Sequence, residues 1–272
     1  MSIISKTFAG FTQTGRKALM PFLTSGYPDQ ETFVKLLYEV EANGADLVEI
    51  GIPFSDPMAD GKTIQAASRE ALNNGMTVRK TLEMIKSMPR KLTIPIILMS
   101  YLNPIFNYGL RDFCRHASDV GVSGLIVPDV IPDEGRELER VAEVFGIDVV
   151  YLLAPTSSTE RIHMILNQSR GFVYLVSLAG VTGARDSLPL ALNQWIQAIK
   201  EQSQLPVCVG FGISNVSQAK EIGRSADGII IGSAIIDIIK KQNSTSQILS
   251  AVGEFITAMR KGLSHDSCYY EC

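Results

Sequence analysis

The run Ile94-Pro95-Ile96-Ile97-Leu98-Met99 is apolar throughout, without the alternation of polar and apolar residues that marks a half-buried strand. Strands that are covered on both faces have such sequences, and they occur in parallel sheets with helices on each side. This run lies in an expected strand at 94–101, and similar runs lie at 18–24, 46–51, 124–127, 148–153, 172–177, 206–210 and 228–231. Each is followed by a helical stretch of about 10–15 residues. The sequence therefore predicts an α/β fold, a single (β/α)8 TIM barrel.

Helices are expected before the first strand as well as between strands. An additional helix at 3–14 precedes the first strand, and a short helix at 235–240 lies at the expected phosphate site after the eighth. Other helical stretches lie at 31–41, 64–73, 112–118 and 134–145. Neither a linker nor a change in composition divides the chain, so we expect one domain over 1–263 and a polar, disordered tail at 264–272. A doubly wound sheet is the alternative, but residues 24–28, after the first strand, lack the GxGxxG pattern.

The composition is that of a globular enzyme. Of the 272 residues 46% are hydrophobic and 19% are charged, and the net charge is −3 without any block of Lys or Arg, so neither nucleic acid nor a membrane is an expected partner. The longest uncharged run, 92–110, contains Pro95 and Pro104, which would break a membrane-spanning helix. No signal peptide is expected. The four cysteines form no CxxC pair and are expected to be free thiols in the cytoplasm.

Glycine-rich turns follow the seventh and eighth strands, at Gly210-Phe211-Gly212-Ile213-Ser214 and Gly232-Ser233-Ala234. Glycine lets backbone N–H groups approach an anion closely, and a helix N-terminus adds a partial positive charge. TIM barrels often bind phosphate at this place. A third glycine loop, at 180–183, follows the sixth strand and could close over the same ligand. The pattern predicts a phosphate-bearing substrate, although each glycine could also serve only a tight turn.

Two carboxylates on and after the second strand are the acid–base candidates. Glu49 interrupts an apolar strand near its C-terminal end, where burial should raise the pKa of the carboxyl group into a useful range. Asp60 follows in a loop that Pro53 and Pro57 stiffen. The alternatives are a buried Glu49 paired with a structural Arg or Lys, and an Asp60 that serves as a turn or capping residue.

Residue types that are missing from the strand ends narrow the reaction. The three histidines lie in predicted helices or the tail, so neither a transition-metal site nor a Ser-His-Asp triad is expected. No lysine lies in a predicted strand interior, which argues against a Schiff-base aldolase. Carboxylate-driven proton transfer on a phosphorylated substrate remains. Apolar and aromatic groups at the strand ends could bind a flat, apolar part of that substrate.

Residues 47–57, Leu-Val-Glu-Ile-Gly-Ile-Pro-Phe-Ser-Asp-Pro, with Ala-Asp-Gly at 59–61, resemble the signature of the tryptophan synthase alpha chain family. The resemblance continues through residues 103–104, 127–129, 179–183, 210–214 and 232–234 in the expected order, and it covers about 8–262. It implies a TIM-barrel lyase that cleaves indole-3-glycerol phosphate into indole and glyceraldehyde 3-phosphate, a retro-aldol step of tryptophan biosynthesis. It also implies a beta-chain partner in an α2β2 heterotetramer, to which indole passes. Pyridoxal phosphate is expected on the beta chain, and neither a cofactor nor a metal on this chain.

The resemblance also assigns roles to individual residues. Glu49 corresponds to the general acid–base, Asp60 to the carboxylate that steadies the charge developing on the indole ring, and Tyr174 to a tyrosine that lines the site. The phosphate-binding positions are Gly183, Gly212, Ile213, Gly232 and Ser233. The indole pocket is Phe22, Met99, Tyr101, Ile126, Phe211 and Ile230. The lid and partner loops contain Pro53, Phe54, Ser55, Asp56, Pro57, Gly180, Val181 and Thr182.

The sequence departs from the family pattern at three places. Leu178 stands where many relatives have arginine, Ile131 stands where proline is common, and the tail after residue 263 has no counterpart. None of these changes removes an expected catalytic residue. Two other functions stay open: a catalytically silent activator of the beta chain, and another phosphate-binding TIM-barrel enzyme of the same pathway.

Overall fold

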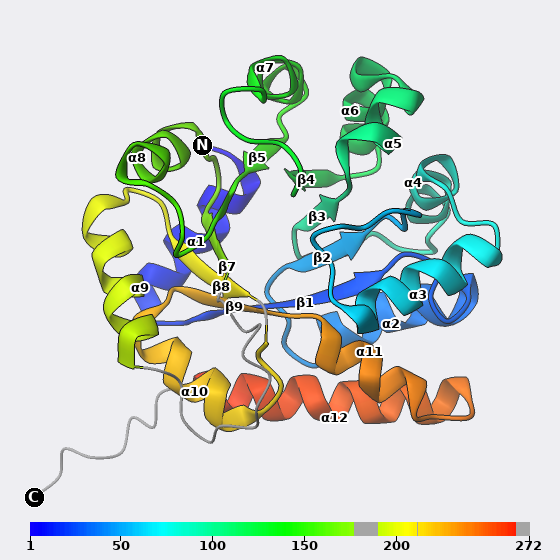
Figure 1. Cartoon of the computed structure of the whole chain (residues 1–272). Helices are drawn as coiled ribbons and strands as arrows, with labels where there is room; N and C mark the ends of the chain where they lie inside the picture. Colours follow the sequence, from blue (N-terminus) through cyan, green and yellow to red (C-terminus); the bar gives the residue numbers. More distant parts are fainter. Residues whose placement is uncertain (177–189, 211, 265–272) are drawn as a thin grey trace, which may run out of the picture.

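The structure, a computed structural model, describes residues 1–176, 190–210 and 212–264, and in them a parallel sheet curls into a barrel surrounded by helices (Figure 1). Neighbouring strands follow the order β5-β4-β3-β2-β1-β9-β8-β7-β6, and every pairing is parallel. The strands are β1 (Ala18–Thr24), β2 (Val48–Gly51), β3 (Ile96–Met99), β4 (Val122–Ile126), β5 (Asp148–Val150), β6 (Leu152–Leu153), β7 (Val173–Val176), β8 (Val207–Gly210) and β9 (Gly228–Ile231). The predicted TIM barrel is confirmed.

The chain itself joins the two ends of this strand order. The predicted strand at 148–153 consists of β5, which pairs with β4, and β6, which pairs with β7, and only Tyr151 separates them. The buried Tyr151 side chain packs in the layer between sheet and helices and donates a 2.5 Å hydrogen bond to Oε1 of Glu139. Eight predicted strands thus appear as nine segments, because one strand breaks where it changes partner.

Helices follow most strands and cover the outside of the barrel. The first helix has the predicted bounds, and helix α11 (Ser233–Lys240) begins two residues before its prediction. Asp29 caps helix α2 (Gln30–Ala42), and Gly44 after it has a φ of +102°. The helices are α1 (Ile3–Thr14), α2 (Gln30–Ala42), α3 (Lys62–Asn73), α4 (Val78–Lys86), α5 (Leu102–Tyr108), α6 (Leu110–Asp119), α7 (Arg136–Val144), α8 (Thr159–Gln168), α9 (Leu190–Gln202), α10 (Val216–Ser225), α11 (Ser233–Lys240) and α12 (Thr245–Leu263).

The apolar core has two layers, because successive side chains of a strand point to opposite faces. In β1, Leu19 and Leu23 pack outward against the helices, whereas Met20 and Phe22 belong to a separate cluster inside the barrel. Helix α1 contributes Ile4 and Phe8 to this inner cluster. The inner layer of the barrel is therefore a packed core.

The expectations about membrane and cysteines can be compared with the described residues. None of the described helices is long and apolar enough to cross a membrane, and the uncharged run at 92–110 contains β3 and α5 instead. Cys114 and Cys208 are buried free thiols. Cys268, Cys272 and the rest of the tail at 265–272 lie outside the described residues.

Candidate active site

Glu49 lies at the centre of the candidate site, on β2. It is flanked by Val48 and Ile50, which pack in the outer layer, so its own side chain points into the barrel, as Leu47 does. The side chain is fully buried, and neither carboxylate oxygen has a hydrogen-bond partner among the described residues. Burial, followed by the nearby Asp60 charge, raises the pKa of Glu49 to about 8. The alternative of a structural Arg or Lys partner finds no support within the described chain.

Asp60 lies in the loop between β2 and α3, and Tyr101 holds it from the end of β3. The Tyr101 hydroxyl accepts a 2.9 Å hydrogen bond from the Ala59 N–H and donates one to the Asp60 carboxylate. Burial raises the pKa of Asp60 to about 6, although the bond from Tyr101 acts in the opposite direction. The N-cap of α3 is Gly61, so the Asp60 carboxylate does not serve as its cap. The backbone N–H of Asp60 closes a turn with the carbonyl of Pro57 at 3.1 Å, whereas its carboxylate interacts with Tyr101.

Tyr174 points into the barrel from β7 and belongs to the same inner cluster as Phe22. Burial, followed by the charge of Glu49, raises its pKa well above 10. A Cβ atom at Gly210 would collide with the Tyr174 ring and hydroxyl, and a Cβ atom at Gly51 would collide with the Phe22 ring. Glycine at these strand ends thus leaves room for two aromatic side chains beside Glu49.

The residues expected in the indole pocket divide into three groups. Phe22, Met99, Ile126 and Ile230 come together in the inner cluster, from four strands. Tyr101 is buried but lies outside that cluster, against the β2–α3 loop, where its ring centroid is 5.2 Å from that of Phe54. Phe211 lies outside the described residues.

The turns after β8 and β9 contain four of the expected phosphate-binding positions, Gly212, Ile213, Gly232 and Ser233. Gly212 has a φ of +88°, which few other residues adopt, and the Ile213 side chain beside it is buried. Gly232 is the N-cap of α11, which begins at Ser233, and offers the helix no capping side chain. The first N–H groups of α11 can therefore bind an anion. The fifth expected position, Gly183, lies outside the described residues.

One buried polar group near Glu49 is absent from the sequence-based expectations. Thr24 lies at the end of β1, paired with Gly51, and its hydroxyl has no hydrogen-bond partner among the described residues. Leu23 packs outward and the Ser25 hydroxyl bonds Thr81 on α4, so Thr24 between them points inward. Strand alternation was the signal that could have found it, since it lies two residues after Phe22.

The segments that follow β2, β3 and β4 carry exposed apolar side chains at the C-terminal rim of the barrel. Met58 after β2 is 87% exposed, Phe106 on α5 is 53% exposed, and Ile131 after β4 is 42% exposed. Ser55 and Asp56, in the first of these segments, are also exposed. Apolar groups on several loops of one rim are typical of a protein-binding surface. The remaining loop residues, Leu178, Gly180, Val181 and Thr182, lie outside the described residues.

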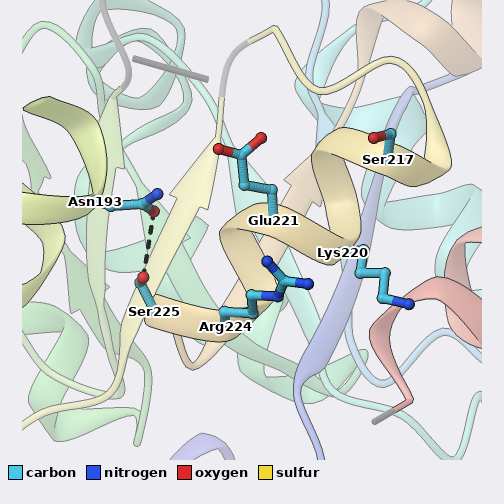
Figure 2. Close-up of a pocket in the computed structure, with 6 residues that line it drawn as sticks. All are labelled: Asn193, Ser217, Lys220, Glu221, Arg224 and Ser225. Carbon is cyan, nitrogen blue, oxygen red and sulfur yellow. Dashed lines mark hydrogen bonds between the residues drawn. The ribbon is translucent and has the colours of Figure 1, made fainter. Parts of the chain in front are cut away.

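A pocket lies outside the group of predicted site residues. The pocket has a volume of about 310 Å³ and lies between α9 and α10 (Figure 2). The Ser225 hydroxyl donates a 3.2 Å hydrogen bond there to the Asn193 side chain. The walls of the pocket come from the two helices alone, without a strand-end residue. It is lined by Asn193, Ser217, Lys220, Glu221, Arg224 and Ser225. Within the parts of the chain that are described, no group of three or more His, Cys, Asp or Glu residues could hold a metal ion.

Comparisons with known sequences and structures all point to one family over nearly the whole chain. The sequence model of the family described as tryptophan synthase alpha chain matches residues 8–264. The chain is 45% identical over 248 residues to the tryptophan synthase alpha chain of Dehalococcoides mccartyi, covering 91% of this chain and 96% of that protein. It is 43% identical over 263 residues to the tryptophan synthase alpha chain of a Geobacter species, covering 97% and 98%. The crystal structure of the tryptophan synthase alpha chain from Legionella pneumophila subsp. pneumophila matches with a TM-score of 0.90 and 35% identity, covering 99% of this chain and 100% of that one.

Proposed function

The chain belongs to the tryptophan synthase alpha chain family, and from this premise we propose how its own residues carry out the family's reaction. The reaction is the cleavage of indole-3-glycerol phosphate in tryptophan biosynthesis, and the chain is a lyase. Members of the family have no cofactor of their own. The products are indole and glyceraldehyde 3-phosphate.

Glu49 is the general acid and then the general base. With a pKa of about 8 it holds a proton at neutral pH and can donate it to C3 of the indole ring. The resulting carboxylate takes the proton of the adjacent glycerol hydroxyl. The C–C bond then breaks, its electron pair returns to the ring, and the hydroxyl carbon becomes the aldehyde of glyceraldehyde 3-phosphate. Glu49 ends the cycle protonated, so no external acid or base is consumed.

Asp60 has the complementary task, because it must be charged while Glu49 is neutral. Protonation at C3 places a positive charge on the ring, and an ionised carboxylate that accepts the indole N–H hydrogen bond stabilises it. The pKa of Asp60, about 6, leaves it mostly ionised at neutral pH. Two carboxyl groups with pKa values separated in this way are typical of an acid–base pair. Tyr174 lines the site beside Glu49.

Different groups of residues bind the two ends of the substrate. The backbone at Gly212 and Ile213 and the N-terminus of α11 at Gly232 and Ser233 bind the phosphate group, supported by the positive φ of Gly212 and by the uncapped helix end. Gly183 joins them by resemblance to the family. The indole ring binds among Phe22, Met99, Ile126 and Ile230, with Phe211 added by resemblance.

The family works with a beta chain, and the finer features of that assembly are part of the proposal. We place the beta chain on the C-terminal rim, where Met58, Phe106 and Ile131 are exposed. The complex is an α2β2 heterotetramer, the beta chain carries pyridoxal phosphate, and indole passes to it. The loops at 53–57 and 180–182 close over the substrate and respond to the partner.

Two further assignments complete the proposal. The chain is one domain over 1–263, supported by an inner and an outer core that both continue around the barrel. Its location is the cytoplasm, supported by the buried free thiols of Cys114 and Cys208 and by the biosynthetic pathway of the family.

The observation that carries this mechanism is the fully buried, unpartnered Glu49 beside Asp60. The test is indole release from indole-3-glycerol phosphate by the purified chain, with and without a tryptophan synthase beta chain. Glu49→Gln should abolish release and keep beta-chain activation, whereas Glu254→Gln, at an exposed position of α12, should change neither. Near-normal release by Glu49→Gln would refute the mechanism. A wild-type chain that activates the beta chain but releases no indole would be a silent activator.

A further inference from the structure

We propose that Tyr101 is a positioning residue, which fixes the β2–α3 loop and aims the Asp60 carboxylate through its hydroxyl group rather than forming a wall of the indole pocket. The inference rests on the proposed role of Asp60. It concerns the geometry that lets Asp60 act, and it assigns this geometry to one phenol oxygen.

The Tyr101 hydroxyl is used in two directions at once. It accepts a 2.9 Å hydrogen bond from the backbone N–H of Ala59, and it donates to the carboxylate of Asp60, the next residue. Its ring packs against the Phe54 ring near the start of the same loop, at a centroid distance of 5.2 Å and an angle of 32°. Tyr101 therefore contacts both ends of a loop whose middle, at Ser55 and Met58, is exposed.

Tyr101 can hold this loop because its own backbone is held from both sides. The preceding residue, Ser100, donates a backbone hydrogen bond of 3.0 Å to the carbonyl of Ile126 on β4. The following residue, Leu102, donates to both carboxylate oxygens of Asp129, at 3.0 and 3.2 Å. Tyr101 is the N-cap of α5 in an extended conformation. A catalytic group needs such support, because a displacement of about 1 Å can reduce a rate a hundredfold.

The burial pattern separates Tyr101 from the indole pocket. The inner cluster contains four of the expected pocket residues, Phe22, Met99, Ile126 and Ile230. Tyr101 belongs neither to this cluster nor to the outer one. Its strand has already ended at Met99, so the inward alternation of β3 does not extend to it. Its contacts are with the loop that bears Asp60.

The electrostatic consequence has a definite sign. Among the described residues, the Asp60 charge raises the pKa of Glu49 from β2 and of Tyr174 from β7, and Asp129 from the β4–α7 loop raises that of Tyr101. Burial raises the pKa of Asp60, and the hydrogen bond from Tyr101 opposes that rise. Removing the hydroxyl should therefore raise the pKa of Asp60 further and leave fewer molecules with an ionised Asp60 at neutral pH.

The test is Tyr101→Phe, which keeps the ring and removes only the hydroxyl. We expect kcat to fall roughly tenfold with KM nearly unchanged, because the bond acts through the transition state and not through substrate binding. The acid limb of the kcat profile should move to higher pH. Tyr108→Phe is the matched control: it removes a phenol from the other end of α5, whose hydroxyl pairs with His116 Nδ1 at 2.8 Å, and it should leave both quantities unchanged.

A second readout does not depend on the lyase assignment. Titration of the Asp60 carboxyl carbon by NMR in the substrate-free chain should give a higher pKa in Tyr101→Phe than in the wild type. An unchanged pKa together with an unchanged kcat would overturn the inference. A rise in KM alone would also overturn it, because Tyr101 would then be a pocket wall. If Glu49→Gln kept its activity the mechanism would fail, and the Asp60 titration would still decide the role of Tyr101.

Discussion

Glu49→Gln should stabilise the folded chain as well as remove its activity. Wild-type Glu49 is buried without a hydrogen-bond partner among the described residues, and its pKa rises from 4.5 to about 8 on folding. A group whose pKa is raised in the folded state stabilises that state while it holds its proton, below the unfolded pKa. The contribution is lost as the pH rises through the folded pKa. Ionisation of Glu49 therefore works against folding at alkaline pH.

The size of this effect follows from the shift in pKa. Each unit corresponds to about 1.4 kcal/mol, so the full penalty above pH 8 is about 5 kcal/mol, of which about 3 kcal/mol is present at pH 7. Glutamine has nearly the same shape and does not titrate. The stability of Glu49→Gln relative to the wild type should therefore increase by about 3 to 4 kcal/mol between pH 5 and pH 8.

The assay is urea unfolding of both proteins at a series of pH values, with the free energy of unfolding taken from each curve. Glu41→Gln is the matched control. Burial alone would raise the pKa of Glu41, but hydrogen bonds from Thr93 and an ion pair with Arg90 lower it overall. Loss of the Glu41 carboxylate should lower the free energy of unfolding at neutral pH. The difference from the wild type should become smaller as the pH falls. A Glu49→Gln difference that does not grow with pH would refute the reasoning.

Two further predictions concern the pH dependence of the reaction and the space around the site. The kcat/KM profile should fall below about pH 6 as Asp60 gains a proton and above about pH 8 as Glu49 loses one. Asp60→Asn should remove the acid limb and move the alkaline limb to lower pH. A profile of this variant with both limbs in place would contradict the prediction. Gly210→Ala should destabilise the chain in urea unfolding by about 1–3 kcal/mol, because its Cβ collides with Tyr174. The control is Gly10→Ala in α1, where a new Cβ atom has no atom within 4 Å, and it should stabilise the chain by about 0.5–1 kcal/mol. If both substitutions destabilised the chain, the collision with Tyr174 would not be the cause.

The sequence predicted the barrel well because its strands are buried on both faces. Two strands have the predicted bounds, β1 at Ala18–Thr24 and β9 at Gly228–Ile231. The break of the fifth strand at Tyr151 was not predictable, since 148–153 is apolar throughout apart from Asp148. The break lies where the strand changes its partner from β4 to β7, and this change of partner leaves no local signal.

The site was predictable where a residue type contradicts its surroundings. A glutamate in an apolar strand is such a contradiction, and the structure places Glu49 where strand alternation requires. Tyr101 was harder, because its position after strand three suggested the pocket. Its role depends on a loop that returns from β2 to meet it, at Ala59 and Asp60. Long-range contacts of this kind become visible only when the loop is placed.

The two layers of the core have different roles, one in stability and one in the site. The outer layer, between sheet and helices, is apolar and continuous. Thr24 and Glu49, the two buried side chains whose polar atoms lack hydrogen-bond partners in the described chain, both belong to the inner layer. They lie at the C-terminal ends of the neighbouring strands β1 and β2, both facing inward. An unsatisfied buried polar group destabilises a fold by about 1–3 kcal/mol, so the outer layer must supply the stability that the inner end lacks. Neutral substitutions at Glu49 should therefore leave the barrel intact, and their effect on indole release reports chemistry rather than unfolding.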